Sequence, residues 1–304
     1  MYCLWFWLRG GKDCFVGQSR LAERRSLIIL AHDGSIYGDW VARYAVRFAA
    51  SEQDRKLLVL HVREGRICPE VVESRLSLIA SECDSFDVEF LPEYLPLGSS
   101  VYRSLRQAIP PNKKALLICG TRVKSRKNRY LAGSVAEKLL RMHECPILAL
   151  RVVQPGLLGN PHDLLLPLAG HLQGFPRIEP VIRRLASHLR SVHVCRIMQV
   201  NSLRHPHLSP DMEHILKQKG RSYLSKFRAE METKLGPVAF RCDQKVMISS
   251  DWAHEVLVQA SRLKAQLMLL GLSERSLAYR VFHSASIERI LHETPCDVGI
   301  YRGL

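Results

Sequence analysis

The chain has 304 residues, of which 47% are hydrophobic, so it is long enough for two domains of ordinary size with separate cores. Its nine cysteines are an odd number without a C-x-x-C pair, which argues against a disulfide framework or a zinc site and for a reducing cytoplasm. The formal net charge of +15 indicates an anionic partner, which could be a nucleotide, a nucleic acid or an anionic membrane.

Residues 1–24 are predicted to form an N-terminal tail. Their apolar run ends at Arg9, lacks a preceding basic region and is far shorter than a membrane span, so neither a secretory signal nor a membrane anchor is expected. Together with the cysteine usage, this predicts a cytoplasmic protein without membrane contact.

From residue 25 onward, short apolar runs alternate with segments of helical periodicity. The runs are nearly continuous in apolar residues, which is typical of parallel strands buried on both faces. Strands are expected at Ser26–Ala31, Leu57–Val62, Asp87–Tyr94, Ala115–Cys119 and Ile147–Leu150, and helices at Tyr37–Ala50, Ile67–Ser81, Ser99–Ile109 and after Gly133. This order predicts an open parallel five-stranded sheet flanked by helices, a Rossmann-like α/β unit at residues 25–153.

One stretch of this unit has the features of a phosphate site. Gly120 ends a strand, a basic loop without acidic residues follows, and Gly133-Ser134 opens a helix. Exposed backbone N–H groups and the helix dipole both favour an anion at such a place. The alternative is an ordinary strand-to-helix turn with a solvated loop. The basic residues of the loop are Arg122, Lys124, Arg126, Lys127 and Arg129.

The second half of the chain repeats this stretch. Leu267–Arg302 superposes on Leu116–Arg151 without a gap, with Glu288 on Glu137, 151 positions apart. Self-similarity at one offset indicates two copies of one fold unit. A Pro- and Gly-rich linker is expected at 154–161 and the second copy at 162–304. Its expected strands and helices are Asp163–Leu168, Val181–Leu189, Val192–Val200, Asp211–Lys234, Val238–Val246, Trp252–Leu263 and Gln266–Leu270.

The stretch resembles the nucleotide loop of the universal stress protein family. That pattern is Gly, two residues, Gly, nine residues, Gly-Ser or Gly-Thr, and a helix that ends near Cys-Pro. Gly120, Gly133-Ser134 and Cys145-Pro146 match it, whereas Val123 stands at the second glycine. The resemblance covers roughly residues 25–151 and identifies the chain as a tandem, two-domain form of the family. It implies ATP or AMP as ligand, with Mg²⁺ accompanying ATP.

The resemblance also implies which residues form the site. Asp33, after the first strand, would contact the adenosine part, although a turn or helix-capping aspartate is the equally weighted alternative. The site would lie beyond the carboxyl ends of the strands, where the strand order reverses. The full set is Ala31, His32, Asp33, Val62, Cys119, Gly120, Arg122, Gly133, Ser134 and Val135.

The second copy lacks several of these residues. Ala169 or its neighbour replaces Asp33, and Ser284-Ala285 replaces Gly133-Ser134, so the site is expected in the first copy alone. No catalytic residue is assigned, and a slow ATPase is the most that is expected of the chain as an enzyme. Three histidines, His205, His207 and His214, are interpreted as solvated surface rather than a metal site.

The preferred hypothesis is an adenine-nucleotide-binding regulatory factor of the stress response. The two copies are expected to pair within one chain through Ile147–Arg151 and Asp297–Tyr301, since each would otherwise be an open sheet edge. A regulatory protein partner is also expected, whereas a nucleic-acid partner is not, because no stacking or recognition motif is present. The alternative is a scaffold that binds no nucleotide and acts through protein contacts.

The departure at Val123 leads to a first prediction. A β-branched residue resists the backbone conformations open to glycine, at a cost of roughly 1–3 kcal/mol. Val123→Gly should therefore tighten ATP more than adenosine, because only the phosphates would reach this part of the loop. Titrating both ligands into both proteins measures the difference. An equal gain for adenosine, or no gain for ATP, would contradict the prediction.

Overall fold

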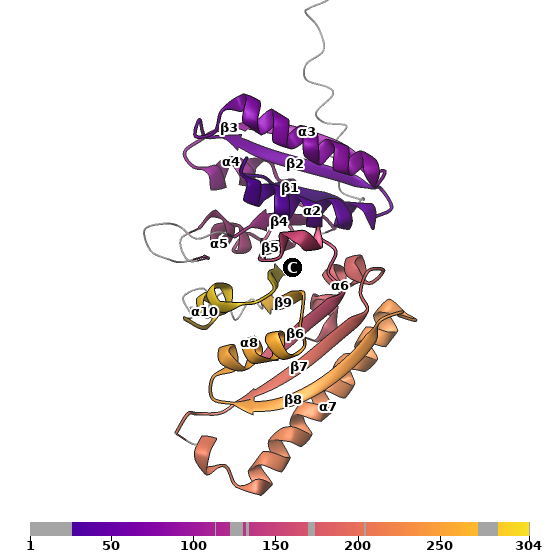
Figure 1. The fold of residues 1–304 in the computed structure, drawn as a ribbon, viewed down its shortest axis with the longest axis vertical. Helices are drawn as coiled ribbons and strands as arrows, with labels where there is room; N and C mark the ends of the chain where they lie inside the picture. The colour runs from indigo at the N-terminus through magenta and orange to yellow at the C-terminus, as the bar shows by residue number, and fades with distance from the viewer. Residues whose placement is uncertain are drawn as a thin grey trace, which may run out of the picture.

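The computed structural model describes residues 26–112, 114–121, 130–131, 134–169, 174–203, 205–272 and 285–303 (Figure 1). The predictions for residues 1–24, Arg122, Val123 and Gly133 lie outside these ranges. The first half of the chain contains β1 (Ile28–Ala31), α2 (Ile36–Ala50), β2 (Lys56–Arg63), α3 (Pro69–Ser85), β3 (Glu89–Pro96), α4 (Val101–Ala108), β4 (Leu116–Gly120), α5 (Val135–Leu140) and β5 (Ile147–Arg151).

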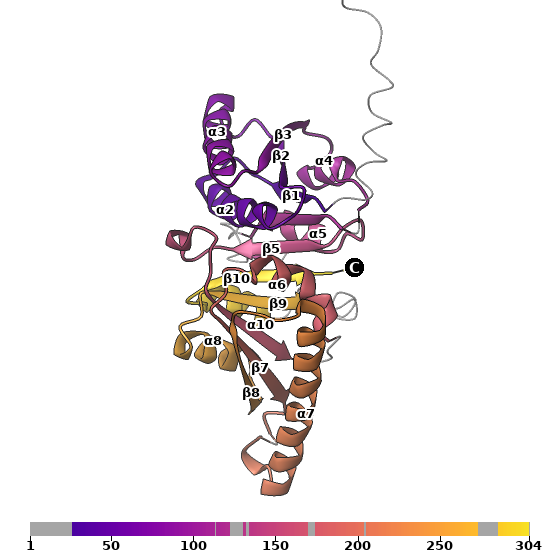
Figure 2. The same ribbon diagram turned by 90° about the vertical axis from the view of Figure 1, so that its right-hand side faces the viewer.

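The first-half strands form a parallel sheet in the order β3-β2-β1-β4-β5. Helices α2 and α3 cover one face and α4 and α5 the other (Figure 2). The strands β1, β2, β4 and β5 are buried almost throughout because helices lie on both faces, as their continuous apolar runs predict. The predicted open parallel sheet is confirmed.

The second half forms a similar sheet in the order β10-β9-β6-β7-β8, parallel throughout. None of the helices in the described part of the chain is long and apolar enough to cross a membrane. The elements are η1 (Pro155–Leu157), β6 (Asp163–Ala169), η2 (Phe175–Arg177), α6 (Glu179–Leu185), β7 (Ser191–Gln199), η3 (His205–His207), α7 (Pro210–Leu235), β8 (Arg241–Ser249), α8 (Trp252–Arg262), β9 (Leu267–Leu272), α10 (Ala285–Glu293) and β10 (Asp297–Arg302).

Some predicted boundaries are wrong by a few residues. Helix α3 begins at Pro69 rather than Ile67. Proline suits the first turn of a helix, because a backbone N–H group there would have no hydrogen-bond partner within the helix. Strand β8 begins at Arg241 rather than Val238. Gly236 ends α7 at φ +71°, and Phe240 packs into the core before strand pairing starts.

The two sheets join through their last strands. Strand β10 pairs antiparallel with β5, with Val298 opposite Arg151 and Arg302 opposite Ile147, which gives one ten-stranded sheet (Figure 2). The predicted pairing of Ile147–Arg151 with Asp297–Tyr301 is confirmed. Each strand would otherwise expose unpaired backbone groups at an edge.

A buried aspartate stabilises this junction through hydrogen bonds. The side chain of Asp297 is fully buried, and its Oδ1 accepts hydrogen bonds from Val153 N at 2.6 Å and Gln154 N at 2.8 Å. Its Oδ2 accepts from the Tyr44 hydroxyl at 2.6 Å. Burial raises the pKa of the Asp297 carboxyl, against the effect of these hydrogen bonds. One carboxylate thus connects β10, the start of the linker and α2.

The contacts of Asp297 predict that replacing its carboxylate by a neutral amide destabilises the folded chain. In Asp297→Asn the amide nitrogen would face donors, so the free energy of unfolding should fall by roughly 2–4 kcal/mol. Tyr44→Phe removes a single hydrogen bond and should cost about 1 kcal/mol. Urea denaturation of the full chain measures both. An asparagine variant as stable as the wild type would show that the carboxylate does not hold the junction.

Candidate functional site

The carboxyl ends of β1 and β4 bring the predicted site residues together. Ala31 of β1 lies opposite Cys119 of β4, so His32 and Asp33 continue beside Gly120. Strand β1 leads into α2 on one face, and the chain after β4 leads into α5 on the other (Figure 2). The strand order reverses between β1 and β4, which is where open parallel sheets bind ligands.

A hydrogen-bonded histidine fixes the turn after β1. The Nδ1 atom of His32 accepts from Gly34 N at 3.1 Å, which assigns the proton to Nε2. The Nε2–H group then donates to Asp39 Oδ1 at 3.1 Å. From β2, His61 Nδ1 donates to the His32 carbonyl at 3.0 Å, and burial lowers the pKa of His61, in keeping with a neutral ring. The buried His32 side chain therefore organises the turn and is not exposed to a ligand.

The partner of His32 is itself paired. Asp39 Oδ2 accepts from Arg75 Nη1 of α3 at 2.5 Å. Burial alone would raise the pKa of Asp39, but the hydrogen bonds from His32 and Arg75 outweigh it and leave this pKa below its usual value. The chain His32–Asp39–Arg75 ties the turn after β1 to both helices on that face.

Asp33 is exposed and forms part of the turn. Its Oδ1 accepts from Ser35 N at 3.0 Å and from Ser35 Oγ at 2.6 Å. Ser35 in turn caps α2, since its Oγ accepts from Gly38 N at 3.2 Å. These hydrogen bonds give Asp33 the turn-forming role that is the alternative interpretation of this residue. The carboxylate nevertheless stays at the surface, beside the first turn of α2, where a ligand could reach it.

The β4 residues of the predicted site pack against helices. Cys119 is buried, and burial raises the pKa of its thiol to about 12, so it is a neutral packing residue at physiological pH. A Cβ on Gly120 would lie 3.3 Å from Val41 Cγ2 and 3.4 Å from Tyr37 Cε1. The missing side chain therefore lets α2 lie close to β4. Tyr37 also accepts a hydrogen bond from Val152 N at 2.8 Å.

The remaining described residues lie on the α5 side of the sheet. Val62 belongs to the same buried cluster as Cys119 and Ala136, with Ala31 and Val135 packed against it. Ser134 caps α5, and its Oγ accepts from Glu137 N at 3.0 Å. The strand registers thus bring Ala31, His32, Asp33, Val62, Cys119 and Gly120 together at one edge, and Ser134 and Val135 begin the helix that packs on that face of the sheet. Arg122 and Gly133 lie outside the described residues.

The strand registers show what stands at the same place in the second half. Leu164 pairs with Leu267 and Val192 just as Ile28 pairs with Leu116 and Leu57, which puts Ala169 at the position of Asp33. By the same registers Arg196 takes the position of His61. Its Nη1 donates to the Leu168 carbonyl at 3.1 Å, the counterpart of the His61–His32 bond.

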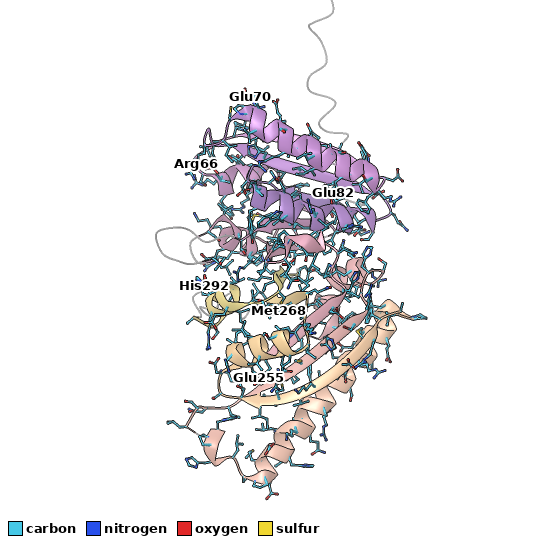
Figure 3. All side chains as sticks on the ribbon, in the orientation of Figure 1. Arg66, Glu70, Glu82, Glu255, Met268 and His292 are labelled. Atoms are coloured by element: carbon cyan, nitrogen blue, oxygen red, sulfur yellow. The ribbon has the colours of Figure 1, made fainter. Side chains whose placement is uncertain are left out.

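Sequence analysis missed one group beside the site. Glu288 of α10 accepts hydrogen bonds from Tyr130 N at 2.8 Å and Leu131 N at 3.0 Å, across the junction between the halves. Figure 3 shows His292 on the same helix, on the side toward the first half. The sequence contains one indication of Glu288, which is its match with Glu137 in the repeat. This match identifies the place of Glu288 in the fold but not its contacts with Tyr130 and Leu131.

Other features of the described residues lie elsewhere. A shallow depression lies at the amino ends of β2 and β3, the edge opposite to the predicted site, and is lined by Gln53, Asp54, Arg55, Asp84, Asp87, Val88 and Glu89. His205 and His207 lie on η3 and His214 on α7. Within the described ranges, no three His, Cys, Asp or Glu side chains are grouped so as to hold a metal ion.

Comparisons with known proteins show which fold this chain shares. No model of a known protein family matches the chain. A protein of Staphylococcus haemolyticus named as a universal stress protein is 28% identical over 41% of this chain and 83% of its own length. Solved structures named as universal stress proteins, from Pseudomonas aeruginosa UCBPP-PA14 and Archaeoglobus fulgidus DSM 4304, match with TM-scores of 0.58 and 0.54 at 16% and 14% identity. The chain is a relative of the universal stress proteins.

The structural matches extend over both halves. They cover 93% and 91% of this chain and 95% and 96% of the matched chains. At such low identity the likeness shows the fold. The universal stress protein fold therefore accounts for the whole described chain, including the second half.

The pKa of Asp39 predicts how the turn after β1 responds to acid. Because the folded-state pKa lies below the unfolded value of about 3.9, the carboxylate stabilises the fold above that pH and loses this effect as the pH falls toward the folded pKa. Asp39→Asn should lower the free energy of unfolding by about 1–2 kcal/mol at pH 7. The difference from wild type should shrink below pH 4.

Urea denaturation at several pH values measures this difference. Glu93→Gln, which changes an exposed carboxylate on β3, is the control and should have little effect at either pH. A wild-type advantage over Asp39→Asn that stays constant down to pH 3 would contradict the assignment.

Proposed function

We propose that this protein is an adenine-nucleotide-binding regulatory factor of the stress response, with a single site in the first half. The observation that carries the proposal is the position of Asp33. This exposed carboxylate lies at the point where the strand order reverses, near Gly120 and two residues after Ala31, which packs against an apolar cluster that includes Val62. Its family relationship supports the stress-response role.

The described residues fit the nucleoside part of such a ligand. A carboxylate that remains at the surface can accept hydrogen bonds from ribose hydroxyls or from the exocyclic amine of adenine. The apolar side chains of Ala31 and Val135 are partly buried against the same apolar cluster and would offer an apolar surface to a base. The turn that presents Asp33 is fixed by His32, so the carboxylate is positioned before a ligand arrives.

The phosphate part of the proposal rests on the sequence. Arg122 and Gly133 are its proposed contacts, and the excess of basic residues in the chain favours an anionic ligand. ATP and AMP are both candidates. With ATP, Mg²⁺ would be held by the phosphates and water, with few protein ligands.

One observation favours a second candidate, the scaffold that binds no nucleotide. Asp33 Oδ1 and Ser134 Oγ each accept hydrogen bonds from their own turns, and packing against α2 is a sufficient reason for Gly120. These three residues therefore have a structural role even without a ligand. The proposal needs a test that separates the two roles.

Isothermal titration of the full chain with ATP, AMP and adenosine provides that test. Asp33→Asn keeps an oxygen for the Ser35 turn but removes the charge and one acceptor, so it should weaken nucleotide binding about tenfold or more with little loss of stability. Asp251→Asn alters the aspartate that caps α8 in the second half and is the control. It should leave affinity unchanged.

The same titration gives the number of sites. One site per chain is expected, because Ala169 stands at the Asp33 position in the second half. Two equal sites would contradict the assignment to the first half. Wild-type protein that binds none of the three ligands at millimolar concentration would favour the scaffold.

A further inference from the structure

The second half of the chain holds a turn of the first half through one carboxylate. Glu288 Oε2 accepts from Tyr130 N at 2.8 Å, and Oε1 accepts from Leu131 N at 3.0 Å. The donors and the acceptor are more than 150 positions apart in the sequence. Two successive backbone N–H groups on one carboxylate form a charge-assisted pair, which is stronger than a pair of neutral hydrogen bonds.

The held turn continues into the start of α5. The carbonyl of Leu131 accepts from Ser134 N at 3.0 Å, and Ser134 Oγ accepts from Glu137 N at 3.0 Å. The Leu131 side chain is fully buried in the apolar core, which fixes the position of the turn. A continuous series of hydrogen bonds therefore runs from α10 of the second half to the first turn of α5.

An aromatic contact holds the same turn from a second direction. The Tyr130 ring packs edge-on against His292, with centroids 4.8 Å apart, and Arg151 lies over the Tyr130 ring at 4.2 Å. His292 follows Glu288 by one helical turn, so both side chains lie on the same side of α10. Arg151 ends β5 and lies opposite Val298 of β10. The turn is thus fixed at the junction that joins the two sheets.

We propose that Glu288 is a positioning residue for the nucleotide site of the first half, supplied by the second half. It does not touch the ligand; it holds Tyr130 and Leu131 and, through them, the backbone of Ser134. This inference rests on the proposed function and assigns the second half a role in it. Without Glu288, ligand binding would also have to order this turn, which lowers affinity.

The chemistry of the contact makes Glu288→Gln the informative change. A glutamine has one acceptor oxygen, and its amide nitrogen would face the second backbone N–H group as another donor. The substitution keeps the size of the side chain and breaks half of the contact. Glu293→Gln is the matched control on the same helix, because Glu293 pairs with the neighbouring Arg289 at 3.2–3.3 Å and is exposed.

The experiment combines binding with amide hydrogen exchange on the full chain. Glu288→Gln should weaken ATP about tenfold and adenosine less, since Ser134 belongs to the phosphate side of the proposed site. Exchange at the Tyr130 and Leu131 amides should accelerate about tenfold or more. Glu293→Gln should change neither quantity. Thermal unfolding checks that each variant is folded, and Glu288→Asp, which keeps the charge but shortens the reach, replaces the glutamine if that variant unfolds.

Each outcome decides a different point. If wild type binds ATP and Glu288→Gln binds it equally well, the positioning role is overturned while the proposed function stands. If exchange at Tyr130 and Leu131 is unchanged in the variant, Glu288 does not hold the turn and the inference is wrong. If the wild type binds no nucleotide, the proposed function fails, and the role of Glu288 in binding fails with it, whatever the exchange rates show.

Discussion

The antiparallel pairing of β5 with β10 is the contact on which the rest of the structure depends. Each strand ends its own sheet, and alone each would expose a row of backbone groups at an apolar edge. Their pairing satisfies those groups and buries Leu148, Leu150, Val298 and Ile300 between helices of both halves. Covalent linkage in one chain gives each half a high effective concentration for the other. The junction also brings α10 next to the turn that precedes α5.

The fold could be predicted from the sequence because its signals are local or periodic. Buried parallel strands appear as continuous apolar runs, and the shared offset between Leu116–Arg151 and Leu267–Arg302 identifies two similar units. The edge strand β8 was harder. Its residues are mostly half-buried and several are charged, which gives a weaker apolar run, and the predicted start at Val238 falls in the turn that follows α7.

The site could be predicted only in part, for a related reason. The ends of parallel strands meet at one edge, so the grouping of Ala31, Asp33 and Cys119 follows from strand order and register. The contacts that fix the site do not follow. Arg75 reaches Asp39 from another helix, and Glu288 reaches Leu131 from the other half of the chain. Such pairs depend on how helices pack, which residue spacing does not encode.

Equivalent positions in the two halves show what the fold itself requires of them. His61 and Arg196 differ in chemistry, yet each donates to the carbonyl at the equivalent position of its half, which is His32 just after β1 and Leu168 within β6, so this position serves the fold in both. Asp33 and Ala169 also occupy equivalent positions, and β6 keeps its register with β7 and β9 although the carboxylate is absent. The local structure differs, however, because β6 continues to Ala169, which pairs with Ile197, whereas β1 ends at Ala31 and Asp33 lies in the turn that follows. Asp33 therefore belongs to a turn that has no equivalent at Ala169, and its bonds to Ser35 give the carboxylate a structural role that titration with nucleotides must separate from ligand binding.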